Sequence, residues 1–273
     1  MTFDERTRAF HGLHQQGSFV LPNAWDAASA AVMADAGAQA LATTSSGMSW
    51  SLGYCDGENL SLDENLAVVA RMIRTVDVPV TADLEAGYGP RPSDVAASIS
   101  AAIEVGASGA NLEDNPRLGE GIIMDADEMA ERLAAAREAA GSTQFVINAR
   151  TDVYLNSVGD PSEREEMAIE RGKGYAEAGA TCLFVPGVGD LDEVTRIVAG
   201  SPLPINSLFM PGYGPSIDEL KAAGVRRISL GGGIAGAAYA TARLAVQQAL
   251  AGEDEVMHTA ISHSDMQALI GSR

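Results

Sequence analysis

The feature that most constrains the fold is a regular alternation of short apolar runs with amphipathic or alanine-rich segments. Eight apolar runs occur, at residues 19–23, 40–45, 78–85, 109–114, 145–152, 181–186, 204–209 and 227–230. A helix-like segment follows each run, and several of these segments end at a glycine, which commonly terminates a helix in the left-handed conformation. Eight strand–helix units predict a (β/α)8 barrel of the TIM type.

A doubly wound open sheet is the alternative for a chain of alternating strands and helices. It is disfavoured because eight units are counted and because no G-x-G-x-x-G motif follows the first run. We therefore expect residues 1–273 to form one barrel domain, with a short N-terminal helix at 2–16 and a helical tail from residue 252 onward.

Composition and charge exclude several classes of partner. The formal net charge is −19 and the acidic residues are spread along the chain, which argues against binding to nucleic acids or anionic membranes. No window approaches ~18 uninterrupted apolar residues, the length that spans a bilayer, and residues 1–17 are polar rather than signal-like. Cys55 and Cys182 have no metal-ligand spacing and fit a reduced, cytoplasmic setting.

Polar side chains gather at the ends of the predicted strands, where barrels of this type carry their active sites. The run 78–85 ends with Asp83 and Glu85, which would share a face because alternate side chains of a strand point the same way. Later strand ends and the loop after residue 45 add further polar residues to the same mouth, namely Asp56, Asn111, Glu113, Asn148, Arg150 and Asn206.

The charges in this mouth are unbalanced. Its four carboxylates, on Asp56, Asp83, Glu85 and Glu113, would face Arg150 as the one obvious cation. Such an excess is unfavourable unless a carboxylate is protonated or a cation lies among them. A hard, oxygen-bound Mg²⁺ ion is therefore expected, with Mn²⁺ as the second candidate. The plain alternative is that these carboxylates cap helices and face water.

Two groups in the mouth are suited to an acidic substrate. Arg150 is a planar fork that fits a carboxylate or a phosphonate, or an ion pair with Asp152 or Glu113. The turn at residues 45–47, Ser-Ser-Gly, could offer backbone N–H groups to an oxyanion, or could simply be a tight turn.

Six segments carry a resemblance to a known group of proteins. They read LPNAWDAAS (21–29), TSSG (44–47), DG (56–57), ADLEAGYG (82–89), NLED (111–114) and NARTD (148–152). In this order they resemble the isocitrate lyase/phosphoenolpyruvate mutase superfamily, over residues 10–251 of the chain. The resemblance implies a Mg²⁺-bound pyruvate enolate or a related intermediate. It also implies homotetramers, or homodimers, that exchange the eighth helix, here residues 235–251.

The resemblance further implies roles for individual residues. The implied metal ligands are Asp83 directly, and Asp56, Glu85 and Glu113 mainly through waters. The implied catalytic residues are Arg150, Ser46, Gly47 and Glu113, and the first three of these would grip the substrate's carboxylate and its C2 oxygen. The implied substrate-binding residues are Trp25, Ser45, Ser46, Gly47, Arg150 and Asn206.

One segment departs from the superfamily pattern. Lyases that act on isocitrate or methylisocitrate carry a Lys-Lys/Arg-Cys-Gly-His loop after the fourth strand, whereas residues 115–123 read NPRLGEGII, without Cys or His. We expect residues 115–124 to form an active-site lid with Gly119 and Gly121 as hinges. In this lid Arg117 would meet a second carboxylate and Glu120 would donate a proton, although both residue types are also common on surfaces.

These observations predict a Mg²⁺-dependent lyase that cleaves a carbon–carbon bond in, or decarboxylates, a small 2-oxo or 2-hydroxy dicarboxylic acid through an enolate. A mutase or hydrolase that acts on the P–C bond of a phosphonate is one alternative on the same scaffold. A phosphate-binding barrel that uses the glycines at 231–233 is a second. A protein that binds Mg²⁺ and a 2-oxo acid without turnover is a third, suggested by the missing lid cysteine.

Overall fold

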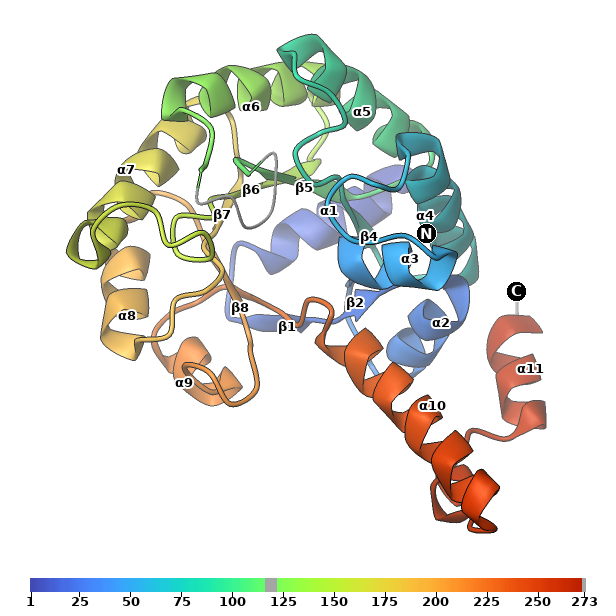
Figure 1. The fold of residues 1–273 in the computed structure, drawn as a ribbon. Coiled ribbons are helices and arrows are strands. Elements are labelled where there is room, and N and C mark those ends of the chain that lie inside the picture. The colour runs from blue at the N-terminus through green and yellow to red at the C-terminus, as the bar shows by residue number, and fades with distance from the viewer. Residues whose placement is uncertain (116–121, 272–273) are drawn as a thin grey trace.

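The central feature of the computed structural model, which describes residues 1–115 and 122–271, is a ring of strands surrounded by helices (Figure 1). The strands are β1 (Phe19–Leu21), β2 (Asn23–Ala24), β3 (Leu41–Thr43), β4 (Val80–Asp83), β5 (Gly109–Glu113), β6 (Val146–Arg150), β7 (Cys182–Phe184), β8 (Ile205–Leu208) and β9 (Arg227–Ser229). Neighbouring strands pair in parallel, in the order β1-β9-β8-β7-β6-β5-β4-β3-β2. The predicted TIM-type barrel is confirmed.

The first predicted strand is two short strands in the structure. Pro22 separates β1 from β2, because proline has no N–H with which to continue a strand ladder. β1 pairs with β9, whereas β2 pairs with β3. The single run 19–24 therefore supplies both edges of the nine-stranded sheet and brings those edges together into a nearly closed barrel.

Helices follow the strands in the predicted alternation and cover the outside of the ring (Figure 1). They are α2 (Ala27–Asp35), α4 (Leu62–Thr75), α5 (Pro92–Glu104), α6 (Ala126–Ala140), α7 (Arg164–Glu177), α8 (Leu191–Gly200) and α9 (Ile217–Ala222), with the 3-10 turn η1 (Pro161–Glu163) before α7. Side-chain caps begin several of them; the Asp26 carboxylate, for example, accepts the N–H of Ser29. Among the described residues, no helix is long and apolar enough to cross a membrane.

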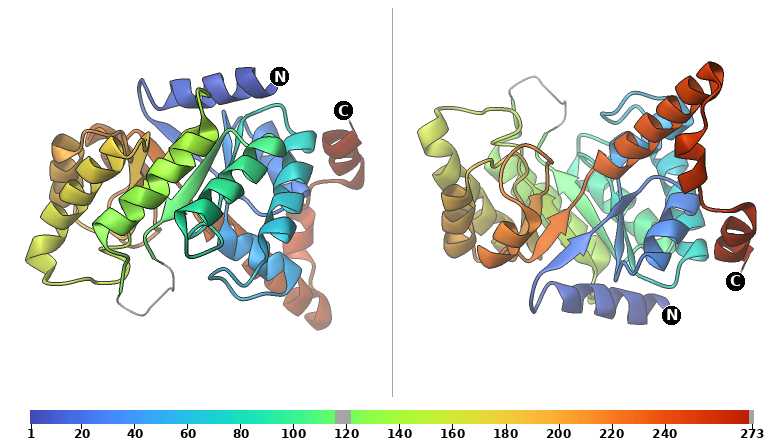
Figure 2. Two further views of the ribbon diagram at one scale, coloured as in Figure 1. Left: turned by 90° about the horizontal axis from the view of Figure 1, so that it is seen from above. Right: turned by 90° about the horizontal axis from the view of Figure 1, so that it is seen from below.

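An N-terminal helix closes one end of the barrel. α1 (Phe3–Leu13) crosses the end opposite to the short helix α3 (Ser45–Leu52), as Figure 2 shows. Its Phe10 is fully buried in a cluster with Phe19 and Val146. The ring of His14 packs edge-on against Phe10 and Phe19, with centroid distances of 4.8 and 5.1 Å. The carboxyl ends of the strands are left as the open face.

Only the first turns of the last barrel helix contact the barrel. α10 (Gly233–Ala251) leaves the ring between α9 and α2 and projects outward (Figures 1 and 2). In α10, which the structure describes in full, only Ala235 is buried. The 3-10 turn η2 (Glu255–Thr259) then reverses the chain, and α11 (His263–Gly271) lies against α2.

Candidate active site

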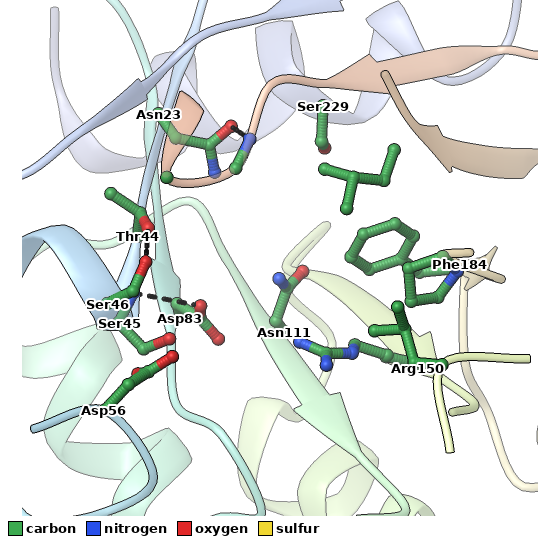
Figure 3. Close-up of a pocket in the computed structure, with 15 residues that line it drawn as sticks. Asn23, Thr44, Ser45, Ser46, Asp56, Asp83, Asn111, Arg150, Phe184 and Ser229 are labelled. Atoms are coloured by element: carbon green, nitrogen blue, oxygen red, sulfur yellow. Dashed lines mark hydrogen bonds between the residues drawn. The ribbon is translucent and has the colours of Figure 1, made fainter. Parts of the chain in front are cut away.

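A pocket of about 130 Å³ opens at the carboxyl ends of the strands (Figure 3). One part of its wall is polar and consists of Asn23, Thr44, Ser45, Ser46, Asp56, Asp83, Asn111, Arg150 and Ser229. The rest is apolar or glycine, and consists of Leu155, Phe184, Pro186, Leu208, Gly231 and Gly232. The pocket thus has a charged side and an apolar side.

Two of the predicted metal-binding carboxylates lie on the charged side. Asp83 ends β4, and its Oδ2 accepts the backbone N–H of Ser45 at 3.2 Å. Asp56 lies on the same side, in the loop after α3, and its Oδ1 is buried without a hydrogen-bond partner among the described residues. Burial, and then the charge of Asp83, raise the pKa of Asp56 above its usual value. Both carboxylates therefore lie at the cavity, and Oδ1 of Asp56 is the carboxylate oxygen there that has no hydrogen-bond partner among the described residues (Figure 3).

Glu85 is not among the residues that line the pocket. β4 ends at Asp83, and Glu85 follows in the left-handed region with a φ of 49°, so the prediction that the two side chains share one strand face is wrong. The Oε2 of Glu85 accepts the N–H of Glu58 at 2.5 Å. Burial, and then the charge of Asp83, raise the pKa of Glu85 to about 8.

Arg150 is held by two carboxylates at once. Its Nη1 lies 2.8 Å from Oε2 of Glu113, and its Nε and Nη2 donate to the two oxygens of Asp152 at 2.6 and 2.8 Å. Burial alone would lower the pKa of Arg150, but Glu113 and Asp152 raise it above its usual value. Burial raises the pKa of Glu113, and Arg150 opposes that shift. The guanidinium is therefore a fixed, permanent cation at the edge of the pocket.

The sequence Ser45-Ser46-Gly47 is the first turn of α3 rather than an isolated tight turn. Thr44 caps the helix, and its hydroxyl lies 3.0 Å from that of Ser46 and 3.5 Å from the N–H of Gly47. A helix N-terminus carries unpaired N–H groups and a partial positive charge. Ser45 and Ser46 line the pocket at this positive end.

Gly47, Gly232 and Trp25 are closely packed around this turn. A Cβ on Gly47 would lie 3.0 Å from Cβ of Trp25, and one on Gly232 would lie 2.7 Å from Oγ of Ser46. Trp25 itself packs toward Tyr239 of α10, with ring centroids 6.3 Å apart. Trp25 and Gly47 are therefore packed against each other and do not line the pocket, whereas Gly232 packs against Ser46.

The structure brings together half of the predicted site residues in the pocket wall. Those that line it are Ser45, Ser46, Asp56, Asp83 and Arg150, whereas Trp25, Gly47, Glu85, Glu113 and Asn206 are not among its lining residues. Asn206 accepts the hydroxyl of Ser229 beneath the floor at 3.1 Å. The predicted lid residues Arg117, Gly119, Glu120 and Gly121 lie outside the described residues.

Several lining residues were missed by the sequence analysis. Asn23 follows the break at Pro22, and its Oδ1 accepts the N–H groups of Leu230 and Gly231 at 3.0 and 2.9 Å. Those two N–H groups are engaged by the protein, which argues against the phosphate-binding alternative. Ser229 and Arg227 are alternate residues of β9 and share its inner face. Polar residues at every second position of a strand are the sequence signal that could have identified Ser229.

Comparison with known proteins gives the family. The phosphoenolpyruvate phosphomutase family model matches residues 10–250. An uncharacterized protein of Mycobacterium tuberculosis is 34% identical over 225 residues, which is 82% of this chain and 81% of that protein. The 2-methylisocitrate lyase of Escherichia coli is 32% identical over 177 residues, 62% of this chain and 58% of that enzyme. Oxaloacetate acetylhydrolase, in complex with its product oxalate, is similar in structure with a TM-score of 0.86, at 26% identity over 98% of this chain and 94% of the other. The chain therefore belongs to the phosphoenolpyruvate phosphomutase family and is an enzyme of the isocitrate lyase/phosphoenolpyruvate mutase superfamily of lyases and mutases.

Proposed function

We propose that this enzyme is a Mg²⁺-dependent lyase that cleaves a carbon–carbon bond in, or decarboxylates, a small 2-oxo or 2-hydroxy dicarboxylic acid through an enolate. The observation that carries the proposal is the placement of Asp56 and Asp83 on one side of the pocket, with Arg150 across from them (Figure 3). A metal ion held by the two carboxylates would bind some oxygens of an acidic substrate, and the fixed guanidinium of Arg150 would bind others.

The residues on the charged side fit a hard divalent cation. The free Oδ1 of Asp56 and the carboxylate of Asp83 are oxygen donors of the type that Mg²⁺ prefers. Within residues 1–115 and 122–271 no three His, Cys, Asp or Glu side chains are grouped closely enough to hold a metal by themselves. Mg²⁺ commonly keeps several waters. Asp83 as direct ligand, with Asp56, Glu85 and Glu113 acting through waters, remains our assignment.

The bound ion would supply Lewis-acid stabilisation of charge on the C2 oxygen of the substrate. The chain's own groups then position the acid. Arg150, fixed by Glu113 and Asp152, binds a substrate carboxylate, and the Ser46 hydroxyl at the α3 N-terminus donates to an oxygen that gains charge.

The phosphonate alternative is less well supported by the pocket. A phosphonate carries more charge on one group than a carboxylate does. Of the described residues, Arg150 is the only cationic side chain in the wall, and two carboxylates already neutralise it. We therefore favour a carbon acid.

The test is release of a 2-oxo acid with Mg²⁺ and with EDTA. The panel is oxaloacetate, methylisocitrate, dimethylmalate and phosphonopyruvate. We expect turnover of a carbon acid that requires metal and is abolished in Asp83→Ala, while Asp63→Ala, which changes an exposed carboxylate of α4, stays active. Turnover of phosphonopyruvate alone would support the phosphonate alternative, and full activity in Asp83→Ala would remove the metal assignment. Binding of a 2-oxo acid without turnover would revive the non-catalytic alternative.

We also propose that α10 is exchanged between two copies of the chain in a homodimer or homotetramer. An apolar groove of about 460 Å³ lies between α2 and α9, where the eighth helix of a barrel would pack, and Val20, Met33 and Ile234 line it. α10 instead projects from the barrel with Leu244 and Leu250 exposed. The α10 helix of one copy could therefore pack in the apolar groove of a second copy. Light scattering should show a multimer that Leu244→Asp weakens, and a monomer at all concentrations would overturn the exchange.

A further inference from the structure

The barrel interior holds an arginine that the proposed mechanism does not use. Arg227, at the start of β9, is fully buried beneath the pocket. Its Nε donates to Oγ of Ser229 and its Nη2 to Oδ1 of Asn111, both at 3.3 Å. Its Nη1 has no hydrogen-bond partner among the described residues, and its Cζ lies 6.0 Å from the centroid of the Phe10 ring.

No carboxylate pairs with Arg227 in the described part of the chain. Removing an unpaired charge from water is costly, and a buried arginine is ordinarily matched by an acid. Burial lowers the pKa of Arg227 to about 10, so the side chain is still charged near neutral pH. A charge retained at such a cost points to a role in the site above it.

The residue that connects Arg227 to the pocket is Asn111. Asn111 lies in register between Asp83 of β4 and Asn148 of β6, and it lines the cavity. Its Oδ1 accepts from Nδ2 of Asn148 as well as from Arg227. Figure 3 shows the Asn111 amide between Asp83 and Arg150.

These contacts fix which way the amide of Asn111 is turned. Arginine has only donors, so the atom that meets Arg227 must be the amide oxygen of Asn111 rather than its nitrogen. The NH2 group then takes the opposite direction, and it makes no hydrogen bond to any described residue. A donor is thereby presented to the cavity, and the positive charge behind it polarises the amide and strengthens it as a donor.

We propose that Asn111 is a substrate-binding residue whose side-chain N–H donates to an oxygen of the bound 2-oxo acid, and that Arg227 is the positioning residue that holds this amide in place. The proposal rests on the proposed function, because it adds a neutral donor to the metal and the Arg150 guanidinium. It assigns the buried charge of Arg227 to the orientation of a single amide.

The test measures binding of oxalate in the presence of Mg²⁺ by calorimetry. Oxalate is a planar dianion with adjacent oxygens, like the enolate of pyruvate, and its binding does not require the true substrate to be known. We expect Asn111→Ala to weaken binding about tenfold or more, since one hydrogen bond to a charged ligand is lost. Thr81→Val is the matched control, because Thr81 Oγ1 is also buried inside the barrel but has no hydrogen-bond partner in the described chain.

The positioning role is tested by Arg227→Met, whose side chain is long and uncharged. Replacing a buried charge with an apolar group of similar length is often tolerated by the fold. We expect oxalate binding to weaken several-fold, Arg227→Lys to recover part of it, and the double variant Arg227→Met/Asn111→Ala to bind no worse than Asn111→Ala alone.

The outcomes separate the two proposals. If the unsubstituted protein binds oxalate neither with nor without Mg²⁺, the proposed function fails. If it binds and Asn111→Ala binds equally well, the role of Asn111 is overturned. If Arg227→Met lowers only the unfolding temperature, or if the losses in the double variant add, Arg227 is a structural residue and its positioning role is overturned.

Discussion

Arg150 and Asp152 form a two-bond ion pair, with Nε–Oδ1 and Nη2–Oδ2 distances of 2.6 and 2.8 Å, at the end of one strand. Asp152 is fully buried, so this pair is shielded from solvent. It turns the guanidinium toward the pocket and leaves Nη1 for Glu113. The geometry explains how a single arginine can be rigid enough to orient a substrate carboxylate.

We expect Asp152→Asn to reduce kcat/KM for the active panel substrate by about tenfold or more and to lower stability by ~3 kcal/mol. The reason is that one partner of a buried charge pair is removed while the other stays buried. The measurements are steady-state kinetics and denaturant unfolding. Glu170→Gln, which breaks the exposed pair with Lys173, should change neither. An unchanged kcat/KM in Asp152→Asn would show that Arg150 needs no orientation.

Gly232→Ala should impair catalysis without unfolding the protein. The new Cβ would lie 2.7 Å from Oγ of Ser46, and displacing that hydroxyl would disturb its contact with Thr44. We expect kcat/KM to fall about tenfold, since a misplaced donor loses most of its effect on developing charge. Gly233→Ala is the control, because a Cβ there meets nothing within 4 Å. Equal activity of the two variants would argue against a role for Ser46.

The apolar side of the pocket should favour substrates that carry alkyl groups. Phe184 and Leu208 line that side together with Leu155 and Pro186. A buried methylene gains about 0.8 kcal/mol, so each methyl group that reaches this wall should raise kcat/KM about fourfold. Dimethylmalate and malate, compared in the same assay, provide the measurement. Equal values for the two acids, or a preference for malate, would contradict this assignment.

His14 should make a destabilising contribution as the pH is lowered from 7 to 5, opposite in sign to that of Glu85, whose raised pKa adds stability over the same range. Burial, and then the charge of Arg227, lower the pKa of His14 to about 3, whereas in the unfolded chain it is about 6.5. The unfolded state therefore binds the His14 proton first, and this residue alone costs the folded state about 2 kcal/mol at pH 5 relative to neutral pH. The measurement is the urea midpoint of each variant minus that of the unsubstituted protein, which should rise for His14→Leu as the pH is lowered from 7 to 5. For His263→Gln, which changes an exposed histidine, this difference should not change with pH.

The barrel could be predicted from the sequence because apolar runs, and glycines that end helices, are local signals. It predicted eight strands, and the ninth arises where Pro22 divides one run between two different neighbours. Asp83, Asp56, Ser46 and Arg150 could be placed because strand ends of a barrel meet at one mouth.

The remaining features of the site depend on contacts that no local pattern encodes. The left-handed backbone at Glu85 removes it from the strand alternation on which its placement was based. The orientation of the Asn111 amide depends on Arg227, which is brought near it only when the ring closes. Trp25 is turned toward Tyr239 by the course of α10, which sequence periodicity does not specify.

The divided strand at Pro22 also has a consequence for synthesis of the chain. β1 pairs with β9, which is the last strand of the barrel in sequence. On that side, the backbone groups of β1 therefore have no partner until nearly the whole barrel has left the ribosome. Such a long-range closure is slow, and an unpaired edge is prone to association in the meantime. In a nascent chain, residues 19–21 therefore form the strand that remains longest without its β9 partner.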